Sequence, residues 1–145
     1  MRTAYRVLAH LVAIAVVVQA ATLAFGIFGI WNDVDAGLVI DDSYEFNAGL
    51  VAHGVVGLMV IPLLALLLLI SSFFAKVRRG ITWALIIVGT VLLQIVLAFA
   101  GFGVPAIGAL HGVNALVIFA LAIVAGRNAR TPAASSADVD DVARV

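Results

Sequence analysis

Four long apolar runs dominate the sequence, and their length limits the folds that the chain can adopt. They cover residues 7–30, 49–74, 81–101 and 105–126. Each run is close to the roughly 20 residues that an α-helix needs to cross a bilayer. A soluble domain of this size could not bury so much apolar surface, because 65% of the 145 residues are hydrophobic and only 11% are charged. The sequence therefore predicts an all-α integral membrane protein, a four-transmembrane-helix bundle.

The charged residues between the runs predict the orientation of the bundle. Basic residues lie only before the first run, between the second and third, and after the fourth, whereas the connection at residues 31–47 carries carboxylates alone. By the positive-inside rule, both termini are expected in the cytoplasm and the acidic connection outside a bacterial cell membrane. The basic residues are Arg2, Arg6, Lys76, Arg78, Arg79, Arg127, Arg130 and Arg144, and the carboxylates of the connection are Asp33, Asp35, Asp41, Asp42 and Glu45.

The sequence divides into one membrane domain and a short tail. The first run is longer than the apolar core of a secretory signal, about 7–15 residues, so we expect it to remain as the first helix of a domain spanning residues 1–126. Residues 127–145 turn to Ala, Ser, Asp and Pro and are predicted to form a disordered cytoplasmic tail. Asp42 and Glu45 have the spacing of a capping box and are expected to start the second helix. The chain has no cysteine, which excludes disulfides and thiolate metal sites.

Two segments of the sequence repeat one another. "HGVVGL" begins at His53 and "HGVNAL" at His111, while "LAFGIFGI" ends the first helix and "LAFAGFGV" ends the third, with Gln19 and Gln94 before them. This pattern predicts a tandem repeat of two helical hairpins. Because two helices separate the copies, the repeats have the same orientation and are related by a pseudo-twofold axis along the membrane normal.

The repeat places one histidine at a similar depth in the second and fourth helices. At 1.5 Å per residue, His53 and His111 lie about 6–9 Å from the outer ends of their helices. Diagonal helices of a bundle are about 11–14 Å apart, which leaves a gap that a planar metal macrocycle can fill. Haem iron accepts imidazole as an axial ligand, and bundle interiors commonly hold cofactors. The sequence therefore predicts one haem b, with His53 and His111 as iron ligands.

Small and polar residues beside the histidines complete the predicted cofactor site. Glycines let a flat ring lie against the backbone, and Asn114 is expected to bond either a haem substituent or a neighbouring helix. Together with the two histidines, the predicted cofactor-binding residues are Gly54, Gly57, Gly112 and Asn114.

Other interpretations of the polar residues remain open. The paired histidines could be structural and simply copied by duplication, or they could handle protons or ions. His10 has only apolar residues opposite it in the repeat, so a second haem would lack a ligand, and we expect this side chain to reach toward the inner interface. Gln19 and Gln94 are expected to bond across helices, with contact to a quinone or to the haem edge as the alternative.

The sequence resembles a family of small bacterial four-helix inner-membrane proteins, particularly those of high-GC Gram-positive bacteria. The resemblance covers residues 7–126 and is carried by "VVVQAATLAFGIFG", "FNAGLVAHGVVG" and "GALHGVNALVIFALA". It implies the fold and a multi-pass location in the inner membrane, and it implies no activity.

A more distant resemblance is to one half of the haem A synthase fold, in which histidines on the second and fourth helices hold haem. "HGVVGLMVIPLLALL" and "LHGVNALVIFALAIVAGRNAR" are similar in placement, so His53 and His111 match ligand positions. The sequence departs from that family in having one bundle, no membrane-embedded carboxylate and no cysteine pair. The resemblance therefore implies haem binding without the family's oxygenase activity.

These observations favour a haem-binding membrane protein that transfers electrons. The expected partners are the lipid bilayer and a quinone or a larger membrane complex, and no nucleic acid is expected. No intramembrane carboxylate, nucleophile or metal triad is present, so we expect no independent enzymatic activity and name no catalytic residue. The alternative is a structural or accessory subunit of a larger membrane complex that holds no cofactor.

Overall fold

The computed structural model describes residues 1–130, and this part of the chain contains helices and no strand. The predicted tail at residues 127–145 thus lies mostly outside the described residues. The helices are α1 (Arg2–Asp35), α2 (Ala48–Val55), the π-helical turn η1 (Val56–Val60), α3 (Ile61–Ala75), α4 (Gly80–Gly103) and α5 (Pro105–Asn128).

Four helices of the described chain are long and apolar enough to cross a membrane, which confirms the expectation of an all-helical, four-span protein. The second span is the continuous segment Ala48–Ala75, made of α2, η1 and α3. Large apolar side chains stay exposed along the spans, among them Phe73 and Phe102 at 61% and 85% exposure. Such a surface suits lipid and not water.

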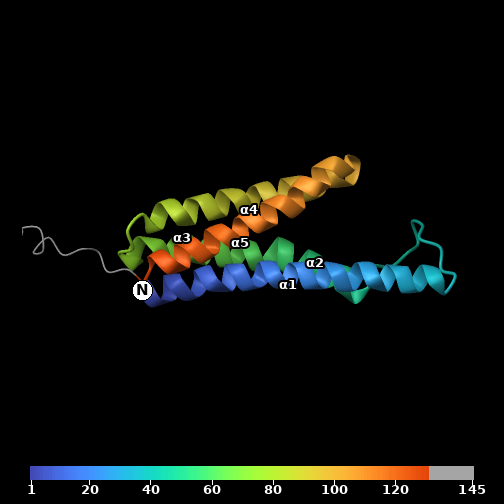
Figure 1. The fold of residues 1–145 in the computed structure, drawn as a ribbon, viewed down its shortest axis with the longest axis horizontal. Coiled ribbons are helices and arrows are strands. Elements are labelled where there is room, and N and C mark those ends of the chain that lie inside the picture. The colour runs from blue at the N-terminus through green and yellow to red at the C-terminus, as the bar shows by residue number, and fades with distance from the viewer. Residues whose placement is uncertain (131–145) are drawn as a thin grey trace, which may run out of the picture.

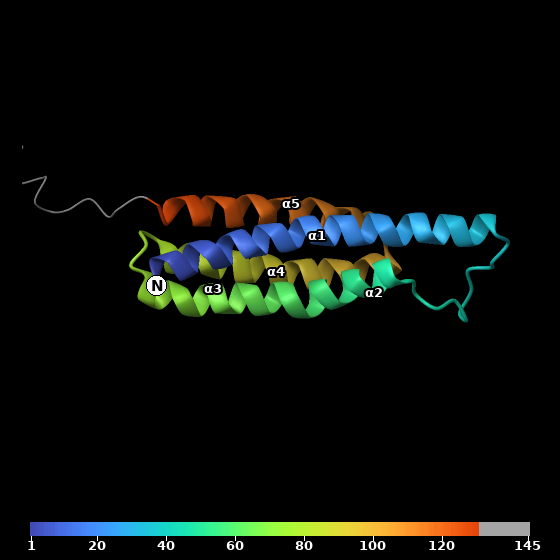
Figure 2. The same cartoon turned by 90° about the horizontal axis from the view of Figure 1, so that it is seen from below.

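The four spans follow one another around the bundle. α1 packs against α2 and α3 on one side and against α5 on the other, and α4 packs against α3 and α5. The second and fourth spans therefore lie on one diagonal of the bundle. Figures 1 and 2 show the elongated arrangement, with the N-terminus beside the end of α5. We call the end of the bundle that carries the N-terminus and the end of α5 the basic end. The opposite end, which carries the loop at residues 36–47, is called the acidic end.

The packed core fills only the half of the bundle near the basic end. Its largest fully buried side chains are those of Tyr5, Val12, Leu68, Ile87 and Ile118. Toward the acidic end, burial becomes sparse.

The first hairpin consists of α1 and the second span, and the second hairpin consists of α4 and α5. The two hairpins diverge beyond this core. The buried residues of α4 end at Val91 and those of α5 begin only at Asn114. Figure 1 shows α4 and α5 separating there from α1 and α2. In this half, packing occurs mainly within each hairpin, where Gly26 of α1 lies against Gly49 of α2 and Gly101 of α4 against Gly108 of α5.

The π-turn η1 compensates for one extra residue in the second span. His53 lies eight positions before Ile61, whereas His111 lies seven positions before Ile118, and both isoleucines are buried. In η1 the Ile61 N–H bonds the Val56 carbonyl, five residues back, so the turn takes up one residue more than an α-turn. His53 therefore stays on the side of its helix that faces the core.

Asn47 starts the second span, and the predicted capping box at Asp42 and Glu45 is wrong. The Asn47 side-chain oxygen accepts hydrogen bonds from the N–H groups of Gly49 and Leu50 at 3.1 and 3.2 Å. Its Nδ2 also donates to the Gly26 carbonyl of α1 at 2.8 Å. The cap thus anchors α2 on α1.

Candidate functional site

Two imidazoles lie at matching places in the two hairpins, each held by the backbone of the preceding helix. His53 Nδ1 is 3.1 Å from the Gln19 carbonyl oxygen, and His111 Nδ1 is 3.0 Å from the Gln94 carbonyl oxygen. A carbonyl oxygen only accepts hydrogen bonds, so each Nδ1 must carry the proton and donate it. In the neutral imidazole, Nε2 then keeps its lone pair.

The two rings come together across the bundle, with 6.3 Å between their centroids and 59° between their planes. The sequence prediction that these residues approach each other is met by this geometry. Within residues 1–130, no three side chains of the His, Cys, Asp and Glu types gather as a metal site. Within these residues, His53 and His111 therefore form a donor pair that is not part of a larger group of such side chains.

Within residues 1–130, no buried polar side-chain atom beside the second histidine lacks a hydrogen-bond partner. Asn114 Nδ2 donates to Gln94 Oε1 at 2.7 Å and to the Thr90 carbonyl at 2.9 Å, and the Asn114 side chain is buried. Of the two roles left open for Asn114, the structure shows contact with the neighbouring helix. The second hairpin thus has an amide chain running from α5 to α4 one turn below the imidazole.

The contacts around the first histidine are less complete. Gln19 Nε2 donates to the His53 carbonyl at 3.0 Å, while Gln19 Oε1 is buried and has no hydrogen-bond partner in the described chain. Val56 follows His53 by three positions, as Asn114 follows His111, and a valine offers no donor. The first hairpin therefore buries an unsatisfied oxygen where the second has a bond.

The predicted glycines differ in their surroundings. A β-carbon at Gly54 or at Gly112 would have no other atom within 4 Å, so the space beside each histidine is open. A β-carbon at Gly57 would lie 2.5 Å from Gln19 Nε2, so this glycine makes room for the glutamine amide. Gly54 and Gly112 thus flank the imidazole pair, and Gly57 supports helix packing.

His10 lies apart from the pair, about 14 Å along α1 from Gln19 at 1.5 Å per residue. Its Nδ1 is 2.6 Å from the Arg6 carbonyl, and its ring occupies the space that a β-carbon at Gly126 would need. His10 therefore packs α1 against α5 near the basic end.

Sequence analysis missed the acceptors of the two histidines. It assigned Gln19 and Gln94 to bonds across helices, and both side chains do bond a neighbouring helix, but the imidazoles are held by the glutamines' backbone carbonyls. Every residue has a carbonyl, so residue type carries no signal for this contact. The available signal was positional, because each glutamine recurs one helix before a histidine.

Comparison with protein-family models, curated proteins and solved structures found no match to this chain.

Proposed function

We propose that this integral membrane protein binds one b-type haem between His53 and His111 and serves in electron transfer. The observation that carries the proposal is the pair of imidazoles fixed through Nδ1, each with Nε2 left to act as a ligand, at a ring separation of 6.3 Å. Metal-bound histidines characteristically donate their other ring N–H to a carbonyl or carboxylate, which fixes the tautomer and ring orientation.

The separation of the rings supports one metal ion between them. Two metal–nitrogen bonds of about 2.0–2.1 Å, with about 1.2 Å from each nitrogen to its ring centre, add up to about 6.4 Å. The observed distance is 6.3 Å. An imidazole ring can be rotated about its bond to a metal, so the 59° between the two rings is compatible with both residues holding one metal ion.

The surroundings favour a flat macrocycle as the carrier of that metal. The hairpins diverge toward the acidic end (Figure 1), and a ring between the histidines would extend beside the open positions at Gly54 and Gly112. When bound, haem supplies one-electron chemistry at its iron. The chain's own part would be to hold both imidazoles in place through their Nδ1 atoms.

The distribution of charge supports an orientation for this activity. All basic residues of the described chain lie in the basic-end segments, and its carboxylates lie at residues 33–45. With the basic end in the cytoplasm of a bacterial cell, the haem site would lie near the outer face of the inner membrane. His10 is packed against Gly126 near the basic end, so a single haem is proposed, with a quinone or a larger membrane complex as the exchange partner.

Absorption spectra of the purified protein test the proposal, with the chain's third histidine as the control. We expect a Soret band and reducible iron in the wild type and in His10→Ala, and loss of that signal in His53→Ala and in His111→Ala. Haem-free protein from cells with ample haem would contradict the proposal and favour the accessory-subunit alternative. Stoichiometric metal without porphyrin would contradict haem and leave a bare metal ion as the ligand.

A further inference from the structure

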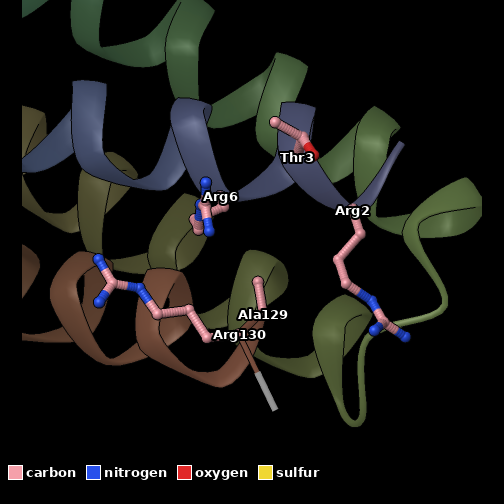
Figure 3. A pocket seen from close by; sticks show the side chains of 5 residues that line it. All are labelled: Arg2, Thr3, Arg6, Ala129 and Arg130. Carbon is pink, nitrogen blue, oxygen red and sulfur yellow. The ribbon is translucent and has the colours of Figure 1, made fainter. Parts of the chain in front are cut away.

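A second polar feature lies at the basic end, at the opposite end of the bundle from the histidine pair. A cavity of about 420 Å³ opens between the first turns of α1 and the end of α5. Figure 3 shows the residues that line it, which are Arg2, Thr3, Arg6, Ala129 and Arg130. Three of the five lining side chains are guanidinium groups, and the other two are a hydroxyl and a methyl group.

The guanidinium groups have no counter-charge within the described chain. Every carboxylate of residues 1–130 lies between Asp33 and Glu45. These residues lie in or after the last turn of α1, a 34-residue helix about 51 Å long, whereas Arg2 and Arg6 lie at its start. Arg2 donates to the Lys76 carbonyl at 3.2 Å, which engages one of its five N–H groups. Like charges that gather without a counter-charge repel one another, and an anion between them removes this cost.

The positive-inside rule accounts for basic residues at this end but not for their gathering around a cavity. Lys76, Arg78 and Arg79 lie in the short connection between α3 and α4 and do not line it. Arg2 and Arg6 come from one end of the described chain and Arg130 from the other. Arg2 and Arg6 are four residues apart on α1, and the fold brings Arg130 to the cavity that they line; in Figure 3 the Arg2 side chain extends away from the other two.

Buried contacts set the walls of the cavity. The Tyr5 hydroxyl donates to the Gly80 carbonyl at 3.2 Å, and the Tyr5 side chain is fully buried. Ala129 is only 3% exposed, and the His10 ring lies directly on Gly126. The Tyr5 bond fixes the first turn of α1 on α4 and the His10 contact fixes α1 on α5, so the arginines of α1 start from a defined backbone position.

We propose that this cavity binds a phosphate group, from an anionic phospholipid of the surrounding leaflet or from a soluble phosphate compound. Guanidinium groups pair with phosphate oxygens through two parallel N–H bonds, and the Thr3 hydroxyl adds a further donor. Basic pockets between membrane helices at the cytoplasmic side suit lipid headgroups in particular. This site is independent of the histidine pair.

Native mass spectrometry of the full chain in neutral detergent tests the site, with phosphatidylglycerol and phosphatidylcholine as probes. We expect phosphatidylglycerol to bind, and the double variant Arg6→Gln/Arg130→Gln to weaken that binding at least tenfold. The matched control Arg78→Gln/Arg79→Gln removes the same two positive charges at the same end, outside the cavity, and should change binding less than twofold. Thermal unfolding of each variant confirms that the fold is kept.

A parallel titration with inorganic phosphate distinguishes the two sources. Binding of inorganic phosphate that is lost in the double variant, with phosphatidylglycerol no better than phosphatidylcholine, would support the soluble source. Equal weakening by Arg78→Gln/Arg79→Gln would overturn the proposal in favour of a general basic surface, and so would binding of neither probe.

The chain's own carboxylates provide one further arm. Asp138, Asp140 and Asp141 follow Arg130 in sequence, and a variant with Asn at all three positions should bind phosphatidylglycerol as the wild type does. If only that variant bound the lipid, the cavity would be a site for the tail's carboxylates and the proposal would be overturned.

Discussion

The two hairpins of the molecule hold a histidine at the same place, but they differ in whether their buried glutamine oxygen is hydrogen-bonded. In both, a carbonyl of the first helix accepts from Nδ1, and a glycine seven positions after the glutamine packs on a glycine of the second helix. The second hairpin satisfies its glutamine oxygen through Asn114, whereas Gln19 Oε1 in the first is buried without a partner. What the hairpins share is therefore what positions the imidazole.

The difference between the hairpins affects the stability of each hairpin and leaves the position of its histidine unchanged. An unsatisfied buried polar group costs about 1–3 kcal/mol, so the first hairpin carries a cost that the second avoids. The first hairpin also needs a π-turn to absorb an extra residue, and such turns are frequent at functional sites. The imidazoles with their carbonyl acceptors and the glycine contacts are matched in the two hairpins, which is what the proposed two-ligand site requires.

The largest difference between the two hairpins is expected when one residue is deleted between the histidine and the buried isoleucine of each. Deleting Met59 in η1 shortens the spacing from His53 to Ile61 to that of the second hairpin, so a regular helix can keep the imidazole in place. Deleting Leu116 has no π-turn to remove and rotates His111 by about 100° about its helix axis. Both side chains face outward, at 67% and 69% exposure, so neither deletion removes core packing.

We therefore expect haem absorbance to survive deletion of Met59 and to be lost on deletion of Leu116. The measurement is haem per protein after purification, with circular dichroism to confirm helix content. His111→Ala provides the reference for folded protein without its ligand. Equal haem content in the two deletion variants would show that the π-turn does not set the register.

The next largest effect is expected at the glycine contacts within the hairpins. A β-carbon at Gly49 would lie 2.6 Å from Gly26 Cα, and one at Gly101 would lie 2.8 Å from Gly108 Cα. Because backbone atoms cannot move aside as a flexible side chain can, the helices must separate. Gly49→Ala and Gly101→Ala should each lower the free energy of unfolding by about 1–3 kcal/mol, measured by denaturant titration in detergent.

Alanine at the two open glycines is the matched control for this prediction. Gly54→Ala and Gly112→Ala add the same methyl group where no atom lies within 4 Å, so stability should not fall. At the proposed site, the same methyl groups would lie beside the haem and should lower its occupancy. A loss of stability in these two variants would mean that protein, and not a cofactor, fills the space.

The smallest effect should come from the glutamine side chains. Gln94→Leu removes the acceptor of Asn114 and should cost about 1 kcal/mol, a typical value for a bond between membrane helices. Gln19→Leu removes one bond and one unsatisfied oxygen together and should be nearly neutral. Both variants keep their carbonyls and should retain haem, so loss of haem in Gln19→Leu would assign its side chain a direct role at the site.

The sequence predicted the features that depend on length and pattern. Runs of about 20 apolar residues indicated four spans, and the repeated His-Gly-Val indicated that His53 and His111 share a depth. The features it missed depend on the backbone or on one residue of register. The carbonyl acceptors have no residue signature, and the π-turn follows from a spacing of eight in one hairpin and seven in the other, which is detectable only when the buried isoleucines are known.

The start of the second span shows the limit of local motifs. Asp42 and Glu45 had the spacing of a cap, but Asn47 lies next to α1 and bonds both its own helix and the Gly26 carbonyl. A tertiary contact therefore decided the helix start. Asn114 is the converse case, because its two possible roles were both named and only the packing of α4 on α5 distinguished them.

The one-sided placement of the core has a consequence for biogenesis. Tyr5, Leu68, Ile87 and Ile118 join all four spans without any contribution from the end that carries the paired imidazoles. Under the proposed function, insertion and assembly could therefore be completed before the haem arrives, and loading would be a late step on an already folded chain. A cell short of haem would then accumulate an intact empty precursor instead of a degraded one.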